Sequence, residues 1–94
     1  MKNLTLRNLT KVCNGIWHGD NALLDQEISA ITTDSRKIEK GCLFVPIVGE
    51  RVDAHRFIPD VITKGALATL SERELPEADY AYIQVESSLQ AVKD

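Results

Sequence analysis

The sequence predicts an α/β fold, a small mixed or parallel sheet with flanking helices. Strand-like apolar runs alternate with segments of helical spacing, and the expected order along the chain is helix, strands, helix, strand, strand. A strand, a helix and a further strand in succession imply at least one right-handed crossover and a sheet covered by helices. The 94 residues can form one modest core but not several domains. We therefore expect one globular piece, without internal repeats or linkers.

The first helix is expected to begin after Thr5, whose hydroxyl suits an N-cap, and to stop at Asn14-Gly15. Apolar residues recur at near-helical spacing along it: Leu6, Leu9, Val12, Cys13 and Ile16. We expect this stripe to face the core and not a partner. Trp17 and His18 follow on a short strand, where His18 is expected to be a surface or hydrogen-bonded structural histidine.

Two strands are expected in the middle of the chain. In the first, one set of side chains alternates with another: Ile28, Ala30 and Thr32 against Ser29, Ile31 and Thr33. The second strand is more buried and runs from residue 42 to residue 45, with Gly41 and Gly49 as turn residues on either side. Pro46 leaves the length of this strand open, because proline has no N–H to donate to a neighbouring strand.

A second helix and two more strands are expected in the last part of the chain. The helix carries Phe57, Val61 and Ile62, has Pro59 in its first turn, and ends at Lys64-Gly65. Residues 66–70 are expected to form a buried strand, residues 71–79 a polar connection, and residues 80–85 the final strand. Beyond it, Ser87 or Ser88 could cap a helix for which Leu89 and Val92 supply a single apolar turn.

Composition excludes several classes of protein. A net charge of -3 without a basic cluster argues against general nucleic-acid binding. Cys13 and Cys42 are expected to be free thiols of a reducing compartment, and His18 and His55 lack the spacing to form a zinc site with them. The apolar runs are too short to insert in a membrane, and no signal peptide is evident. We expect a cytoplasmic protein.

Two polar loops are expected to converge on one side of the strands. In the first, Thr33 and Ser35 offer hydroxyls, Asp34 offers an acceptor, and Arg36 offers a planar fork for phosphate or carboxylate. The second contributes further polar groups: Glu50, Arg51, Asp53 and His55. The alternative is a purely structural turn, in which Asp34 and Ser35 bond the local backbone and Arg36 lies on the surface.

Four groups of residues together carry a resemblance to a known family. They are Thr33-Asp34-Ser35-Arg36, Gly41-Cys42-Leu43-Phe44-Val45, Gly49-Glu50-Arg51 with Asp53-Ala54-His55 and Phe57, and Gly65-Ala66. This set resembles the N-terminal domain of the Mur ligases, ATP-dependent amide ligases that build the peptide stem of peptidoglycan. Leu4-Thr5-Leu6, Asn14-Gly15 and the Asp-Ala-His run favour the branch that adds D-alanyl-D-alanine (MurF) over the branch that adds one amino acid (MurE), which usually shows Asp-Gly-His.

The resemblance implies a domain that holds the uridine diphosphate end of UDP-N-acetylmuramoyl tripeptide. By motif position, Thr33 and Ser35 would contact the uridine and diphosphate region, and Glu50, Arg51 and Val52 would line the uracil side. Arg36 could meet a phosphate oxygen, although pairing with Asp34 is favoured. The residues expected to shape the loops are Asp34, Gly49, Asp53 and His55.

The resemblance also implies that chemistry takes place elsewhere. Residues 1–85 would be the recognition domain, and residues 86–94 would begin a helix leading to an ATP-binding domain absent from this sequence. No phosphate-binding loop of the Gly-x-x-x-x-Gly-Lys-Ser/Thr type occurs, so no catalytic residue, cofactor or metal site is expected in these residues. ATP, Mg²⁺ and D-alanyl-D-alanine would bind to later domains, in an enzyme that serves cell-wall synthesis and so cell shape and division.

Three other functions stay open at this point. The chain could belong to a MurE-type ligase, or it could be a free-standing protein-interaction domain, which would need an exposed apolar patch. It could also be a small hydrolase with Ser35, His55 and Asp53 as a triad. A triad is recognised by geometry, so Ser35 and His55 would have to lie within hydrogen-bond reach.

Overall fold

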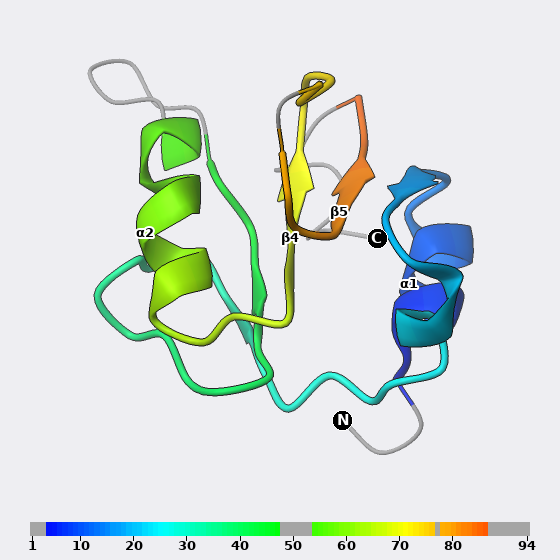
Figure 1. The fold of residues 1–94 in the computed structure, drawn as a ribbon, viewed down its shortest axis with the longest axis horizontal. Helices are drawn as coiled ribbons and strands as arrows, with labels where there is room; N and C mark the ends of the chain where they lie inside the picture. Colours follow the sequence, from blue (N-terminus) through cyan, green and yellow to red (C-terminus); the bar gives the residue numbers. More distant parts are fainter. Residues whose placement is uncertain (1–3, 48–53, 77, 87–94) are drawn as a thin grey trace.

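The computed structural model describes residues 4–47, 54–76 and 78–86, and Figure 1 shows their arrangement. Five strands form one sheet in the order β1-β5-β4-β3-β2. The strands are β1 (Ile16–His18), β2 (Ile31–Thr32), β3 (Leu43–Phe44), β4 (Ala68–Ser71) and β5 (Tyr82–Gln84). The helices are α1 (Leu6–Val12) and α2 (Ile58–Thr63), and two short 3₁₀ turns are η1 (Asn21–Leu23) and η2 (Ala54–Phe57).

The sheet is mixed, as the sequence predicts. Strands β2, β3, β4 and β5 are parallel to their neighbours, whereas β1 pairs antiparallel with β5 at one edge. Each parallel pair needs a crossover, and α2 with η2 supplies the one between β3 and β4. The carboxyl ends of β2 and β3 therefore meet at the same end of the sheet.

Two apolar clusters lie on opposite faces of the sheet, because neighbouring residues of a strand point to opposite sides. On one face Leu6 from α1 packs with Leu43, Leu70 and Ile83. On the other face α2 packs its side chains around Phe44, which is fully buried. Figure 1 shows the two helices at opposite ends of the view, with β4 and β5 between them.

The first helix is shorter than its apolar pattern suggests. Thr5 is the N-cap and accepts the Asn8 N–H at 3.2 Å, as predicted, but the helix ends at Val12. Asn14 then takes a positive φ of 55°, which breaks the periodicity. The predicted core stripe is wrong at its far end: Val12, the last residue of α1, is 58% exposed, and Ile16, which lies on β1 beyond the turn, is 60% exposed.

The strand around residue 31 is also shorter than predicted. Ile28 and Ala30 do not share a face, since Ile28 belongs to the α1 cluster and Ala30 packs against the α2 cluster. Parallel pairing begins only where the Leu43 N–H reaches the Ala30 carbonyl, at 2.8 Å. It ends where the Val45 N–H reaches the Thr32 carbonyl, at 2.9 Å, directly before Pro46. Pro46 follows this last bond, but its nitrogen lies on the opposite side of the strand from the Val45 N–H, so its missing donor faces β4 and not β2.

The second helix and the last strands follow the prediction with small shifts. Helix α2 stops before Lys64, and Gly65 has a φ of 114°. Strand β4 extends to Ser71, which was expected in the polar connection but is fully buried, with its hydroxyl donating to the Arg73 carbonyl at 2.6 Å. A local hydrogen bond of this kind lets a serine end a buried strand.

Cys13 and Cys42 are both free cysteines, of which Cys42 is buried and Cys13 is half-buried. Burial raises the pKa of the Cys13 thiol. His18 lies on β1 with its Nε2 3.0 Å from Gln84 Oε1 and its ring stacked on Tyr82, so it is structural as expected. The predicted helix after residue 86 and five of the loop residues lie outside the described part of the chain: Gly49, Glu50, Arg51, Val52 and Asp53.

Candidate functional site

A hollow of about 620 Å³ opens where β2 and β3 end. Its lining comes from the first polar loop, from β3 and from η2: Thr33, Asp34, Ser35, Arg36, Phe44, Ala54 and Phe57. In open α/β sheets, ligands bind outside the carboxyl ends of the strands, and this volume is in the range of small-molecule pockets. We therefore take this cavity, the turn hollow, as the candidate site.

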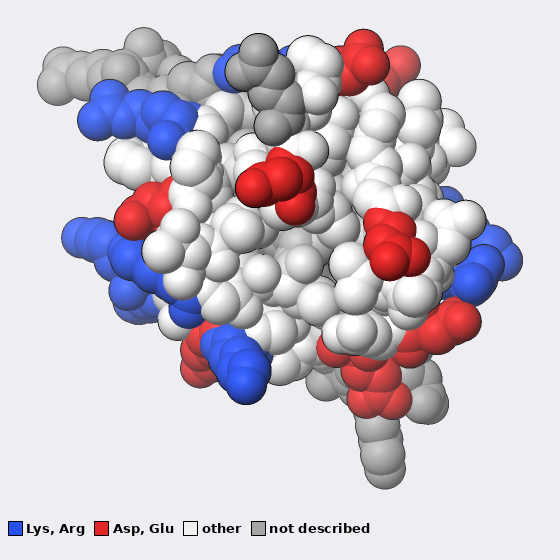
Figure 2. Space-filling model, viewed as in Figure 1, with Lys and Arg blue, Asp and Glu red and all other residues white. Residues whose placement is uncertain are grey.

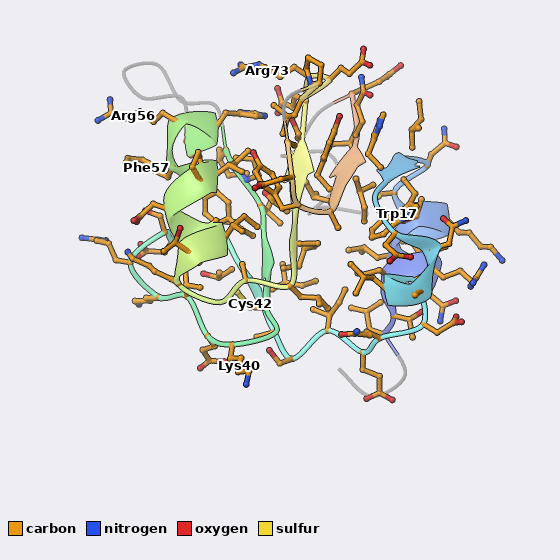
Figure 3. The ribbon with its side chains drawn as sticks, viewed as in Figure 1. Trp17, Lys40, Cys42, Arg56, Phe57 and Arg73 are labelled. Carbon is orange, nitrogen blue, oxygen red and sulfur yellow. The ribbon has the colours of Figure 1, made fainter. Side chains whose placement is uncertain are left out.

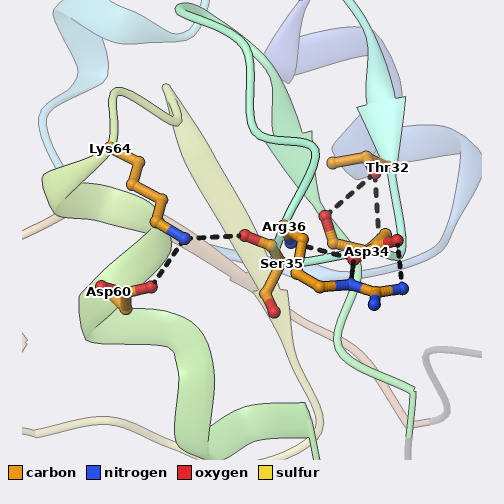
Figure 4. Close-up of polar contacts among 6 residues, drawn as sticks. All are labelled: Thr32, Asp34, Ser35, Arg36, Asp60 and Lys64. Atoms are coloured by element: carbon orange, nitrogen blue, oxygen red, sulfur yellow. Dashed lines mark hydrogen bonds and ion pairs between the residues drawn. The ribbon is translucent and has the colours of Figure 1, made fainter.

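The turn at residues 33–36 is shaped by its own side chains. Thr32 Oγ1 accepts the Asp34 N–H at 3.1 Å, and Asp34 Oδ1 accepts the Arg36 N–H at 2.9 Å. Figure 4 shows both bonds side by side. Such side-chain turns fix the backbone without help from a sheet. Asp34 thus bonds the local backbone, as the alternative of a structural turn predicts. The turn that Asp34 shapes nevertheless borders a cavity.

Asp34 also pairs with Arg36 through two hydrogen bonds. Arg36 Nε donates to Asp34 Oδ1 at 3.0 Å, and Nη2 donates to Oδ2 at 3.1 Å. These bonds, with the Arg36 N–H, lower the pKa of Asp34 to about 2, and the carboxylate raises the pKa of Arg36. The Arg36 side chain is 86% exposed. The pair is therefore held in one orientation with a guanidinium edge open to solvent.

Helix α2 is joined to the turn by Lys64. Its Nζ donates to the Ser35 carbonyl at 3.2 Å and lies 3.0 Å from Asp60 Oδ2 (Figure 4). Asp60 stands four residues earlier on the same helix, which is the favourable order for such a pair. A second cation thus lies beside the turn hollow.

The opposite wall of the hollow is formed by η2. Phe57 is half-buried there, with the guanidinium of Arg56 5.0 Å from its ring centre. Figure 3 shows Arg56 and Phe57 near one end of α2. His55 is buried, and its Nε2 accepts the Glu72 N–H at 2.8 Å. His55 therefore ties η2 to the end of β4, and does not line the hollow.

The structure brings together part of the predicted site. Thr33, Ser35, Arg36 and Asp34 lie around one cavity, whereas Glu50, Arg51, Val52, Gly49 and Asp53 fall outside the described residues. Sequence reasoning missed two contributors, Phe57 as a wall and Lys64 as a link. Phe57 could have been found as an aromatic next to a polar loop; Lys64 offered no signal, because nothing in a sequence shows that it reaches residue 35.

A second hollow of about 580 Å³ lies at the other edge of the sheet, where β1 and β5 pair. We call it the acidic hollow, because the described residues of its lining include three carboxylates and neither lysine nor arginine: His18, Gly19, Asp20, Leu23, Glu74, Leu75, Pro76, Ala78, Asp79, Tyr80, Ala81 and Tyr82. Figure 2 shows acidic side chains near the middle of the view and basic ones along both margins. The two hollows thus differ in charge.

Other kinds of site find no support among the described residues. No hydrogen bond joins Ser35 to His55, whose Nε2 is occupied by the Glu72 N–H, so the hydrolase triad is wrong. In the described ranges, His, Cys, Asp and Glu form no group that could hold a metal ion. Of the helices described, none is both long and apolar enough to span a membrane.

Comparison with known proteins gives a consistent result. Residues 27–94 match the model of the "Mur ligase family, catalytic domain". The chain is 42% identical over 76 residues to the UDP-N-acetylmuramoyl-tripeptide--D-alanyl-D-alanine ligase of Buchnera aphidicola subsp. Baizongia pistaciae, covering 79% of this chain and 16% of that protein. It is 49% identical over 72 residues to the UDP-N-acetylmuramoyl-L-alanyl-D-glutamate--2,6-diaminopimelate ligase of Cytophaga hutchinsonii, covering 72% and 15%.

A solved structure supports the same fold. MurF from Acinetobacter baumannii superposes with a TM-score of 0.84 at 35% identity, covering 95% of this chain and 19% of that one. The small mixed sheet is therefore that of the N-terminal domain of MurF, which confirms the predicted fold class. The chain spans about a sixth of the length of the curated relatives it matches. The family model covers most of the sequence and the fold agrees with it, and so the chain belongs to the Mur ligase family.

Proposed function

We propose that this chain is the substrate-recognition part of an ATP-dependent ligase that adds D-alanyl-D-alanine to UDP-N-acetylmuramoyl tripeptide. In this proposal residues 1–85 hold the uridine diphosphate end, and residues 86–94 lead toward an ATP-binding domain. The observation that carries it is the turn hollow, where the preformed Thr33–Arg36 turn borders a cavity at the carboxyl ends of two parallel strands. ATP, Mg²⁺ and the dipeptide would bind outside these residues, in a cytoplasmic enzyme.

The residues around the hollow suit the uridine and phosphate groups. Thr33 and Ser35 supply hydroxyls that can donate or accept, and Arg36 supplies guanidinium donors fixed by Asp34. Phe57 adds a half-buried aromatic wall. The proposal also keeps Glu50, Arg51 and Val52 on the uracil side, with Gly49, Asp53 and His55 shaping their loop.

Such a site would act through binding, far from the bond that is made. Contacts to the nucleotide end of a substrate orient its reactive end and supply binding energy that a catalytic domain can use. The reaction implied by the family activates the tripeptide carboxylate as an acyl phosphate, which the amine of D-alanyl-D-alanine attacks. None of the described residues takes part in that step.

A second candidate is a ligase that adds diaminopimelate, since one relative of that kind is 49% identical over 72 residues. The structural match over 95% of the chain to MurF and the Asp53-Ala54-His55 run favour the dipeptide-adding branch. Turnover of the full-length polypeptide with each amine substrate, D-alanyl-D-alanine or diaminopimelate, separates the two candidates.

Calorimetric titration of the full-length polypeptide that contains these residues tests the proposed site. UDP-N-acetylmuramoyl tripeptide and UMP are the ligands, and ATP with each variant is the control. Ser35→Ala and Arg51→Ala are expected to weaken uridine-ligand binding, by about 0.5 to 1.5 kcal/mol for a neutral hydrogen bond and more for a charged one. ATP affinity should not change. Unaltered uridine-ligand affinity in both variants would contradict the site assignment.

A further inference from the structure

Lys64 occupies a position that the internal hydrogen bonds of the turn do not explain. Thr32 and Asp34 fix the shape of the turn. Because both residues lie in the turn or next to it, their bonds cannot position the turn relative to α2. The placement of the turn against α2 needs a contact from outside. Among the hydrogen bonds of the described residues, that contact is Lys64 Nζ to the Ser35 carbonyl.

The chemistry of the link suits a positioning role. An ammonium group has three N–H donors, and here one meets the Ser35 carbonyl while Asp60 holds the group from the helix side. Lys64 is the C-cap of α2, so its backbone is fixed at the end of a helix whose Ile58 and Val61 are buried. Through Lys64, the turn is therefore held in a fixed orientation relative to the core.

We propose that Lys64 is a positioning residue for substrate binding, which sets the Thr33–Arg36 turn at the distance from η2 that the uridine diphosphate end requires. This proposal rests on the proposed function of the turn hollow. Lys64 itself is absent from the lining of the hollow, so it acts through Ser35 and does not have to touch the ligand.

The variant Lys64→Met tests this role, because it keeps most of the apolar stem and removes the donors. In the full-length polypeptide we expect the affinity for UDP-N-acetylmuramoyl tripeptide to fall about three- to tenfold, the effect of one lost hydrogen bond. In the ligation assay the KM for that substrate should rise while kcat and the KM for ATP stay the same. The thermal midpoint should shift by no more than about 2 °C, since exposed ion pairs add little stability.

Three further variants separate positioning from general electrostatics. Lys64→Arg keeps donors at the same place and should restore affinity to within about twofold of the unmodified protein. Asp60→Asn removes the ion pair that holds the Lys64 ammonium but keeps the ammonium itself, so its loss of substrate affinity should be intermediate. Lys37→Met removes an equal charge from a residue directly after the turn, without removing the link, and should weaken binding less than Lys64→Met.

Two results would overturn the role of Lys64 while leaving the proposed function intact. One is unchanged substrate affinity in Lys64→Met. The other is an equal loss of affinity in Lys64→Met and Lys37→Met, which would show that the loss comes from the removed charge and not from the hydrogen bond to Ser35. A failure of the unmodified protein to bind UMP and UDP-N-acetylmuramoyl tripeptide would instead overturn the proposed function, and with it the role of Lys64.

Discussion

The turn hollow and the acidic hollow lie at the two ends of one row of cross-strand neighbours. The row runs across the sheet through Thr32, Phe44, Thr69, Tyr82 and His18, which follow one another in the pairing register. Side chains paired in this way point to the same face. One face of one small sheet thus carries two cavities of similar size, about 620 and 580 Å³.

The difference between them is chemical. The turn hollow has hydroxyls, a carboxylate neutralised by Arg36, and Lys64 close by. In the acidic hollow Asp20, Glu74 and Asp79 stand without a lysine or arginine in the lining. Because like charges repel across a desolvated contact, a diphosphate is favoured in the first and disfavoured in the second. Cavity size alone would not have distinguished them.

The largest effect is expected from removing the floor of the turn hollow. Phe44 is fully buried between the sheet and α2, so Phe44→Ala should lower the free energy of unfolding by about 3 to 5 kcal/mol. Chemical denaturation measures this loss. Leu75→Ala in the half-buried wall of the acidic hollow is the control and should cost less. Equal losses of unfolding free energy would mean that the walls of the two cavities contribute equally to the stability of the fold.

A carboxylate placed in the turn hollow should make it resemble the acidic one. Ser35→Asp is expected to weaken binding of UMP to the full-length polypeptide by more than about tenfold, because a carboxylate in the lining would repel the phosphate that the proposed site binds. Ala78→Asp adds the same charge to the acidic hollow and should leave UMP affinity unchanged. The titration is calorimetric. If Ala78→Asp were the damaging variant, the roles of the two cavities would be reversed.

A smaller effect is expected from the phenol of the acidic hollow. The Tyr82 hydroxyl accepts the Leu75 N–H at 2.8 Å, so Tyr82→Phe leaves that donor without its partner and should cost about 1 kcal/mol of unfolding free energy. UMP affinity should stay the same. A loss of affinity as large as the one caused by Ser35→Ala would show that the two hollows are coupled through the sheet.

The smallest effect concerns pH. The folded pKa of Asp34 is lowered to about 2, so the pair with Arg36 stabilises the folded state above the ordinary aspartate pKa. That contribution is complete above about pH 4 and is lost as the pH falls toward about 2. The carboxyl carbon shift of Asp34 reports this titration by NMR. Arg36→Gln should move its midpoint upward, and an unmoved midpoint would contradict the cause assigned to the shift.

The sequence predicted the parts of this fold in which local chemistry decides. Thr5 caps α1 and α2 stops before Gly65, because each depends on the residue itself. The apolar spacing failed at Ile16, because the turn at Asn14 separates it from the helix, and at Val12, which is the last residue of α1 but is exposed. Apolar spacing does not show at which residue a helix ends; the turn residue shows it.

The candidate site divides in the same way. The Thr33–Arg36 turn could be predicted, since Asp34 and Ser35 are residues that bond their own backbone. The link from Lys64 could not, because it depends on how α2 packs over β3, whereas Phe57 could have been found as an aromatic next to a polar loop. Contacts between residues about thirty positions apart follow from tertiary packing, which no local pattern encodes.

Hydrogen–deuterium exchange of the full-length polypeptide, with and without saturating UDP-N-acetylmuramoyl tripeptide, tests the central claim most directly. Binding in the turn hollow should slow exchange in peptides that cover residues 33–36 and 54–57, and leave residues 18–23 and 74–82 unchanged. UMP should reproduce the protection near the turn. Protection confined to residues 18–23 and 74–82 would contradict the account and place the ligand in the acidic hollow.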